Sequence, residues 1–148
     1  MGKYTYSRSN VTMNTANDLM TLIAAASRRA RIIEISVTGM GTTSAAGEVG
    51  VFRSTGGTTG GGALTGAKGS SDLPAAAGVV NTTWAAQPTL TGAPDGLARL
   101  GVNQNGANYR WVARPGEEIE LRNSEQISIR PVVGSHAISM HVVVEEDY

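Results

Sequence analysis

Residues 109–146 decide the fold, and they read YRWVARPGEEIELRNSEQISIRPVVGSHAISMHVVVEE. Apolar and polar residues alternate in this stretch. Ile127 and Ile129 flank Ser128, and the same period of two runs through residues 137–144. Because successive side chains of a strand point to opposite faces, each run predicts a strand with one buried and one wetter face. The sequence therefore predicts a β-sheet protein.

Two strands upstream are predicted in the same way, each with its apolar residues on one face: residues 31–37 with Ile33, Ile35 and Val37, and residues 48–53 with Val49 and Val51. Residues 18–26 fit either a strand or a helix capped by Asn17 or Asp18. We favour the strand, because everything that follows is strand-like.

Turn residues separate these runs. Pro115-Gly116 is a strong turn signal, since proline presets φ at one central position and glycine supplies a positive φ at the next. We expect this turn to join residues 109–113 to residues 118–122 as a hairpin. Short strands at such regular spacing are typical of a sandwich or a barrel.

The remaining segments are poor in apolar residues. Residues 1–12 are interpreted as an extended arm or a first edge strand, ahead of one sandwich domain at residues 13–148. Residues 54–80 are rich in Gly, Thr and Ala and predict a long exposed loop. Residues 81–102 are interpreted as a loop that lies back on the sheet, with Trp84 as its anchor.

Composition bears on association and location. The chain has 148 residues, of which 16% are charged, and its net charge is zero. Near-neutral chains tend to associate, so we expect a homo-oligomer. There is no cysteine, so disulfides and thiolate metal sites are excluded. No signal peptide or membrane-spanning stretch is visible, and we expect a soluble protein made in a cytoplasm.

Candidate chemical sites are weak. Gly61 to Ser70 departs from a phosphate-binding loop because Ala67 separates Gly66 from Lys68. His136 and His141 lie five residues apart, so they are expected on opposite faces and cannot share a metal ion. The sequence predicts no catalytic, cofactor or metal site, and we expect no enzyme.

Charged residues gather in three places. Glu117, Glu118 and Glu120 form a solvated group beside the Pro-Gly turn. The basic cluster of Arg28, Arg29 and Arg31 has no interleaved aromatics, and with zero net charge it argues against nucleic-acid binding. We expect it to form salt bridges at a subunit contact or to be solvated. Residues 145–148 are interpreted as a solvated acidic tail, or as a complement to arginines on a neighbour.

The order of these features resembles a known family. Residues 18–22 (DLMTL) and 31–37 (RIIEISV) precede a Gly/Thr/Ala-rich middle and 81–84 (NTTW), and residues 109–112 (YRWV) and 114–121 (RPGEEIEL) follow. This pattern is similar to that of small virion proteins of tailed bacteriophages with a jelly-roll, tumour-necrosis-factor-like sandwich. The resemblance implies an all-β antiparallel jelly roll with an N-terminal arm and a long Gly/Thr/Ala-rich loop. It also implies a decoration or stabilising role on the capsid, often as a homotrimer.

From this resemblance we expect a virion protein whose partners are the major capsid protein and further copies of itself, without nucleic acid or membrane. The segments expected to contact a partner are the arm at residues 1–12 and the long loop at residues 54–80. The single residues expected to do so come from the arm and the basic cluster: Lys3, Tyr4, Tyr6, Arg8, Arg28 and Arg29. The alternative is a carbohydrate- or receptor-binding jelly roll of a head fibre or tail, in which Trp84 or Trp111 would line a groove.

Overall fold

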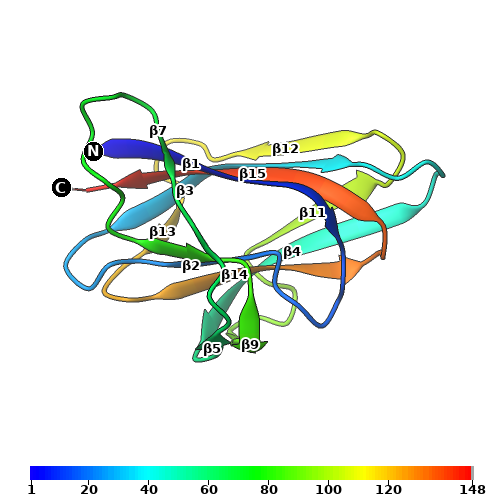
Figure 1. The fold of residues 1–148 in the computed structure, drawn as a ribbon, viewed down its shortest axis with the longest axis horizontal. Helices are drawn as coiled ribbons and strands as arrows, with labels where there is room; N and C mark the ends of the chain where they lie inside the picture. The colour runs from blue at the N-terminus through cyan, green and yellow to red at the C-terminus, as the bar shows by residue number, and fades with distance from the viewer. Residues whose placement is uncertain (148) are drawn as a thin grey trace.

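The computed structural model describes residues 1–147, and these fold into two antiparallel sheets packed face to face as a sandwich (Figure 1). The prediction of an all-β sandwich is confirmed. The sheets form an upper and a lower layer in Figure 1, with both chain ends at the left. Among the described residues no helix is long and apolar enough to cross a membrane.

The first sheet has the strand order β12–β3–β15–β1–β7, and β13 pairs with β3 beside β12. Its strands are β1 (Gly2–Thr12), β3 (Ala30–Gly39), β7 (Ala67–Lys68), β12 (Asn108–Val112), β13 (Ile119–Leu121) and β15 (Ala137–Glu146).

The second sheet has the order β10–β4–β14–β2–β8–β6, and β11 pairs with β4 beside β10. Its strands are β2 (Met20–Ile23), β4 (Ala46–Thr55), β6 (Ala63–Leu64), β8 (Val79–Asn81), β10 (Thr89–Thr91), β11 (Ala98–Asn103) and β14 (Gln126–Val133). A separate pair, β5 (Thr58–Thr59) with β9 (Trp84–Ala86), projects below the sandwich in Figure 1.

The core lies between the sheets and contains the residues that the period of two predicts. In the second sheet the fully buried residues include Val49, Val51, Ile127 and Ile129. On β15 of the first sheet the buried residues are Ile138, Met140, Val142 and Val144. Residues 18–26 hold the short strand β2, which confirms the favoured interpretation over the helix. The alternation in the sequence thus places the buried face of most long strands.

A β-bulge in β3 overturns one predicted face. Val143 pairs with Glu34 but Val144 pairs with Ile32, so Ile33 is an extra residue in the ladder. A bulge shifts the alternation by one position. Ile32 is therefore fully buried together with Ile35 and Val37, whereas Ile33 is only half-buried. The prediction that Ile33 faces the core was wrong.

The predicted hairpin around Pro115-Gly116 was also wrong, although the turn itself is present. Gly116 has a φ of 87°, and the amide of Glu117 donates to the carbonyl of Arg114. However, β12 and β13 do not pair with each other. Both pair with β3, one after the other along the same edge. The turn interrupts a single edge of the sheet instead of reversing the chain.

Of the two interpretations of residues 1–12, the structure has the strand. β1 pairs with β15 from Gly2 to Thr12, interrupted by one irregularity after Arg8. The segment is thus part of the first sheet and not a free arm. The sequence of this segment is largely polar, yet it alternates between buried and more exposed residues, because Tyr4 and Tyr6 point into the core.

Residues 54–102 are more ordered than the sequence suggests. Within the expected long loop, β7 pairs with β1, and β6 pairs with β8. The following segment holds β11, which pairs with β4 and buries Leu100 and Val102. The alternation of Leu100 and Val102 is the signal for this strand, and it was missed among the surrounding turn residues.

Candidate functional site

The expected partner contacts separate into buried and exposed groups. Tyr4 and Tyr6 are 0% and 2% exposed, and the Tyr4 hydroxyl donates to the carbonyl of Pro74 at 3.1 Å. Burial, with the nearby Glu146 carboxyl second, raises the pKa of Tyr6. These two tyrosines form part of the core, so they are not surface contacts. The correction follows from β1 being a strand of the sheet.

The four basic residues lie nearer the surface. Lys3 pairs with Glu145 at 3.3 Å, and Arg29 lies 3.6 Å from Glu120. Arg8 instead donates to the carbonyl of Leu19, and burial lowers its pKa. Arg28 is half-buried. The structure does not bring the four together, since Arg8 points toward the second sheet and the others lie near the chain ends.

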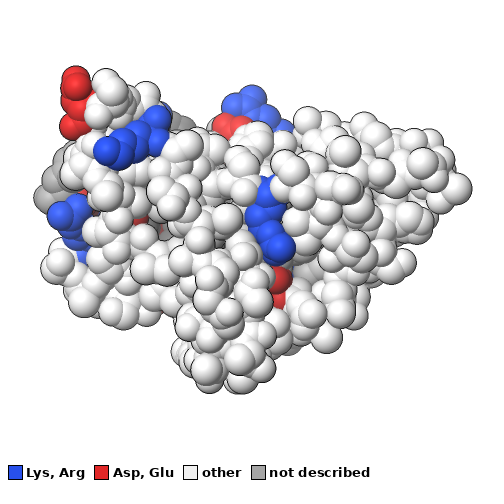
Figure 2. All heavy atoms as spheres, in the orientation of Figure 1, with Lys and Arg blue, Asp and Glu red and all other residues white. Residues whose placement is uncertain are grey.

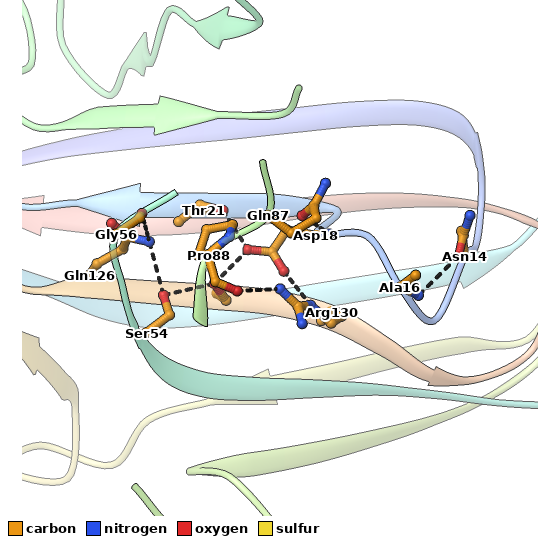
Figure 3. Close-up of polar contacts among 11 residues, drawn as sticks. Asn14, Ala16, Asp18, Thr21, Ser54, Gly56, Gln87, Pro88, Gln126 and Arg130 are labelled. Atoms are coloured by element: carbon orange, nitrogen blue, oxygen red, sulfur yellow. Dashed lines mark hydrogen bonds and ion pairs between the residues drawn. The ribbon is translucent and has the colours of Figure 1, made fainter. Parts of the chain in front are cut away.

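A buried polar network lies on the outer side of the second sheet, and its centre is Asp18 (Figure 3). The Asp18 side chain is 0% exposed and forms an ion pair with the Arg130 guanidinium. Its other carboxylate oxygen accepts hydrogen bonds from the hydroxyls of Thr21 and Ser128. Ser128 Oγ lies 2.8 Å from Ser54 Oγ, which accepts from Gln126 Nε2. Every oxygen of the buried carboxylate is thus satisfied.

The network holds a segment of chain against the sheet. Arg130 Nη2 donates to the carbonyl of Pro88 at 3.0 Å, and the amide of Asp18 donates to Gln87 Oε1 at 2.9 Å. We call residues 56–62 and 82–88, which carry β5 and β9, the tongue. Gln126 also donates to the carbonyl of Gly56, so both halves of the tongue contact this network. A buried ion pair adds little net stability, and its better-supported role is to fix one arrangement of the chain.

A second polar group lies on the outer face of the first sheet. Arg110 donates two hydrogen bonds of 2.7 Å to the Glu34 carboxylate, and His141 Nε2 lies 3.0 Å from the same carboxylate. The Arg110 hydrogen bonds lower the pKa of Glu34 from 4.5 to about 2, more than burial raises it. Glu34 therefore remains a carboxylate through the physiological pH range.

The acidic end is only partly solvated. Glu146 is 2% exposed, and its carboxylate accepts hydrogen bonds from the amides of Ala77 and Gly78 at 2.8 and 3.0 Å. The prediction of a solvated tail was wrong at this residue. The period of two predicts its burial when it is continued beyond Val142 and Val144. Tyr148, the last residue of the predicted tail, lies outside the described residues.

Two of the carboxyl groups beside the Pro-Gly turn, those of Glu118 and Glu120, are held in their charged form. The backbone amides of Glu118 and Gly116 lower the pKa of Glu118. A side-chain hydrogen bond from Arg122 lowers the pKa of Glu120. A general acid at neutral pH needs a raised pKa, so the arrangement is that of solvated ion pairs.

The described residues contain no group of three or more His, Asp or Glu side chains that could hold a metal ion. His136 and His141 are separated, because His136 precedes β15 and donates its backbone amide to Gln104 Oε1. Charged side chains are sparse on the face of the molecule in Figure 2, most of which is white.

No family model, curated protein or solved structure matches this chain.

Proposed function

We propose that this chain is a structural virion protein of a tailed bacteriophage, which binds the exterior of the capsid in many copies and stabilises the shell. Its role is mechanical and not catalytic. Its partners are the major capsid protein and further copies of itself, and its place is the assembled virion. A ligand that binds only the assembled shell stabilises that shell by mass action.

The observation that carries the proposal is the nested pairing of the strands. β1 pairs with β15, β2 with β14, β3 with β12 and β13, and β4 with β11. Each pair encloses the next, as in one long hairpin folded over on itself. A jelly roll is a double sheet of eight strands built from two Greek keys, and this pairing supports the jelly-roll assignment. It agrees with the fold that the resemblance implies.

The carbohydrate-binding alternative has less support. Trp84 is half-buried and its ring packs on Gly57, with Nε1 enclosed by protein. Trp111 is half-buried against the core. Both rings lie against the protein's own atoms, which is unlike an open aromatic platform for a sugar. We therefore propose only the capsid-binding function.

Binding to particles tests the proposal, because many functions share the jelly-roll fold. Purified protein is mixed with capsids assembled from the major capsid protein encoded in the same genome, and the mixture is sedimented. We expect many copies per particle and a raised melting temperature of the shell. Bovine serum albumin serves as the control for trapping. Capsids that carry no more of the chain than of the control would refute the function.

The proposal includes a homotrimer. Sedimentation velocity of the free protein should then show a species of about three times the 15.3 kDa chain mass. The physical reason is the low charge and zero net charge, which favour association. A single species at the chain mass across the accessible concentration range would contradict it.

A further inference from the structure

The two outer faces of the sandwich differ. The outer face of the second sheet is covered by the chain itself: Phe52 is 6% exposed beneath the Arg99 guanidinium, and Ser128 is fully buried. On the first sheet several outward side chains reach solvent, whereas Ser36 on β3 is 5% exposed. Thr5 and Val143 are half-buried, and Val112 is 53% exposed. This outer face of the first sheet, the open face, therefore has side chains that a partner can reach.

A row of alternating charges crosses this open face. Lys3 on β1 pairs in register with Glu145 on β15, Glu145 pairs with Arg31 on β3, and Arg31 pairs with Glu120 on β13. The neighbours of these residues point into the core, so all four side chains point outward. Read across the sheet, the signs are plus, minus, plus, minus.

Such a row is complementary to itself. A two-fold axis parallel to the strands, midway between β15 and β3, reverses the order of the row in a second copy. Lys3 then faces Glu120 of the second copy, and Glu145 faces Arg31 of the second copy. Each charge meets its opposite, twice over by symmetry. We propose that the outer face of the first sheet is a self-association surface on which two copies meet about this axis.

The neighbouring rows satisfy the same axis. In one row Ser7, His141, Ser36 and Arg110 stand side by side on β1, β15, β3 and β12. The axis places Ser7 opposite Arg110, and His141 opposite Ser36, of the second copy. No two like charges face each other in this row.

The row that lies between the charged row and the row of Ser7 contains two apolar side chains, Val143 and Val112. Thr5, Val143, Glu34 and Val112 stand in register. The axis places Thr5 opposite Val112 of the second copy, so the most exposed valine of this face becomes covered. Glu34 faces Val143 and keeps its two hydrogen bonds from Arg110 within its own chain. The contact therefore combines charge pairs at one end with apolar contact toward the centre.

This inference rests on the self-association that the proposed function includes, but it does not require capsid binding. A contact between identical surfaces is isologous and closes after two copies. It therefore doubles whatever assembly the other surfaces form, giving a dimer alone or a hexamer with the trimer.

The test is a charge exchange between two variants. In Arg31→Glu, residue 31 faces Glu145 of the second copy with the same sign, and in Glu145→Lys, residue 145 faces Arg31 of the second copy with the same sign. Each variant alone should lose two-fold association by about tenfold or more, because facing like charges disfavour a contact. In a mixture of the two variants, each chain again meets opposite charges, so association should return.

Sedimentation velocity and light scattering measure the association, and circular dichroism checks that each variant is folded. Asp95→Lys is the matched control, since its side chain is 100% exposed and lies away from this face. Where one variant is unfolded, Lys3→Glu and Glu120→Lys provide the same exchange at the outer positions of the row. Association should also weaken as salt is added, because the facing charges are screened.

The outcomes separate this inference from the capsid function. Folded single variants that associate like the wild type, or a mixture that fails to recover, would overturn the two-fold contact. A wild-type protein without an even-numbered species would overturn it as well. In either case the capsid-binding measurement is independent, and its failure alone would remove the proposed function and leave the two-fold contact standing.

Discussion

At the scale of single residues, Asp18 shows how a buried charge can organise a surface segment. Its carboxylate reaches Arg130 on β14 and Thr21 on β2, and the same arginine holds the carbonyl of Pro88. The partners lie far apart in the sequence, so no local pattern could predict them. The sequence suggests only a helix cap at this position, and the fold gives it a different role.

Asp18→Ala should lower the free energy of unfolding by about 3–5 kcal/mol, because it leaves the Arg130 guanidinium without its partner in a buried site. Urea unfolding followed by tryptophan fluorescence measures the change. Asp95→Ala is the matched control, since this fully exposed aspartate makes a surface ion pair with Arg99 and its loss should leave the free energy of unfolding nearly unchanged. Equal effects of the two substitutions would contradict the role of the network.

Glu34 should make stability depend on pH in acid. Its pKa is about 2 in the folded protein, lowered mainly by Arg110, against 4.5 ordinarily. The folded state therefore binds this proton less readily than the unfolded state, so the stabilisation is fully present above pH 4.5. It is lost as the pH falls from 4.5 toward 2.

The measurement compares wild type with Glu34→Gln by urea unfolding at several pH values below 5. The difference between their free energies of unfolding should shrink as the pH falls through this window. Arg110→Gln should narrow the window, because it removes the hydrogen bonds that lower the pKa. A difference that stays constant from pH 5 to the acid limit of the folded state would show that Glu34 is not held as a carboxylate by Arg110.

At the scale of elements, the sequence predicts faces well where the ladder is regular. Val49, Val51, Ile127 and Ile129 are buried as their alternation predicts. The prediction fails at Ile33, because a bulge depends on the register of the neighbouring strand β15 and not on local sequence. The prediction of a hairpin at Pro115-Gly116 is wrong for a related reason. A turn signal specifies the backbone of a few residues and leaves open which strands pair.

The bulge can be tested with one substitution at two adjacent positions. Ile32→Ala should cost about 2–5 kcal/mol, because Ile32 is 0% exposed and the loss leaves a cavity in the core. Ile33→Ala should cost less than about 1.5 kcal/mol, because Ile33 is only half-buried on the other side. Urea unfolding of both variants gives the comparison. A larger loss of stability for Ile33→Ala than for Ile32→Ala would show that Ile33 faces the core, as regular alternation predicts.

At the scale of the whole molecule, the nested pairing joins the two chain ends. Gly2 pairs with Glu146, so the first and last strands are neighbours in the sheet. Contacts of such long sequence separation require closing a long loop before they form, which slows folding. The sequence could not predict this arrangement, because the alternation along each strand says nothing about which strand lies beside it.

A circular permutant tests the nested topology. A short Gly/Ser linker joins the two ends, and new ends are opened between Gly60 and Gly61 in the tongue, where Gly61 has open space around it. This permutant should remain folded, because no long strand is interrupted, and the β1–β15 pair becomes a local hairpin. Its refolding rate, measured by stopped-flow fluorescence, should exceed that of the wild type.

The control carries the same linker but is opened between Ser128 and Ile129, in the middle of the buried strand β14. It should fail to fold, because both residues are fully buried and pair with β2 and β4 on either side. If the first permutant is unfolded while the control folds, the chain ends are not neighbours and the nested pairing is refuted. If the first permutant folds but refolds no faster than the wild type, pairing of β1 with β15 is not the slow step of folding.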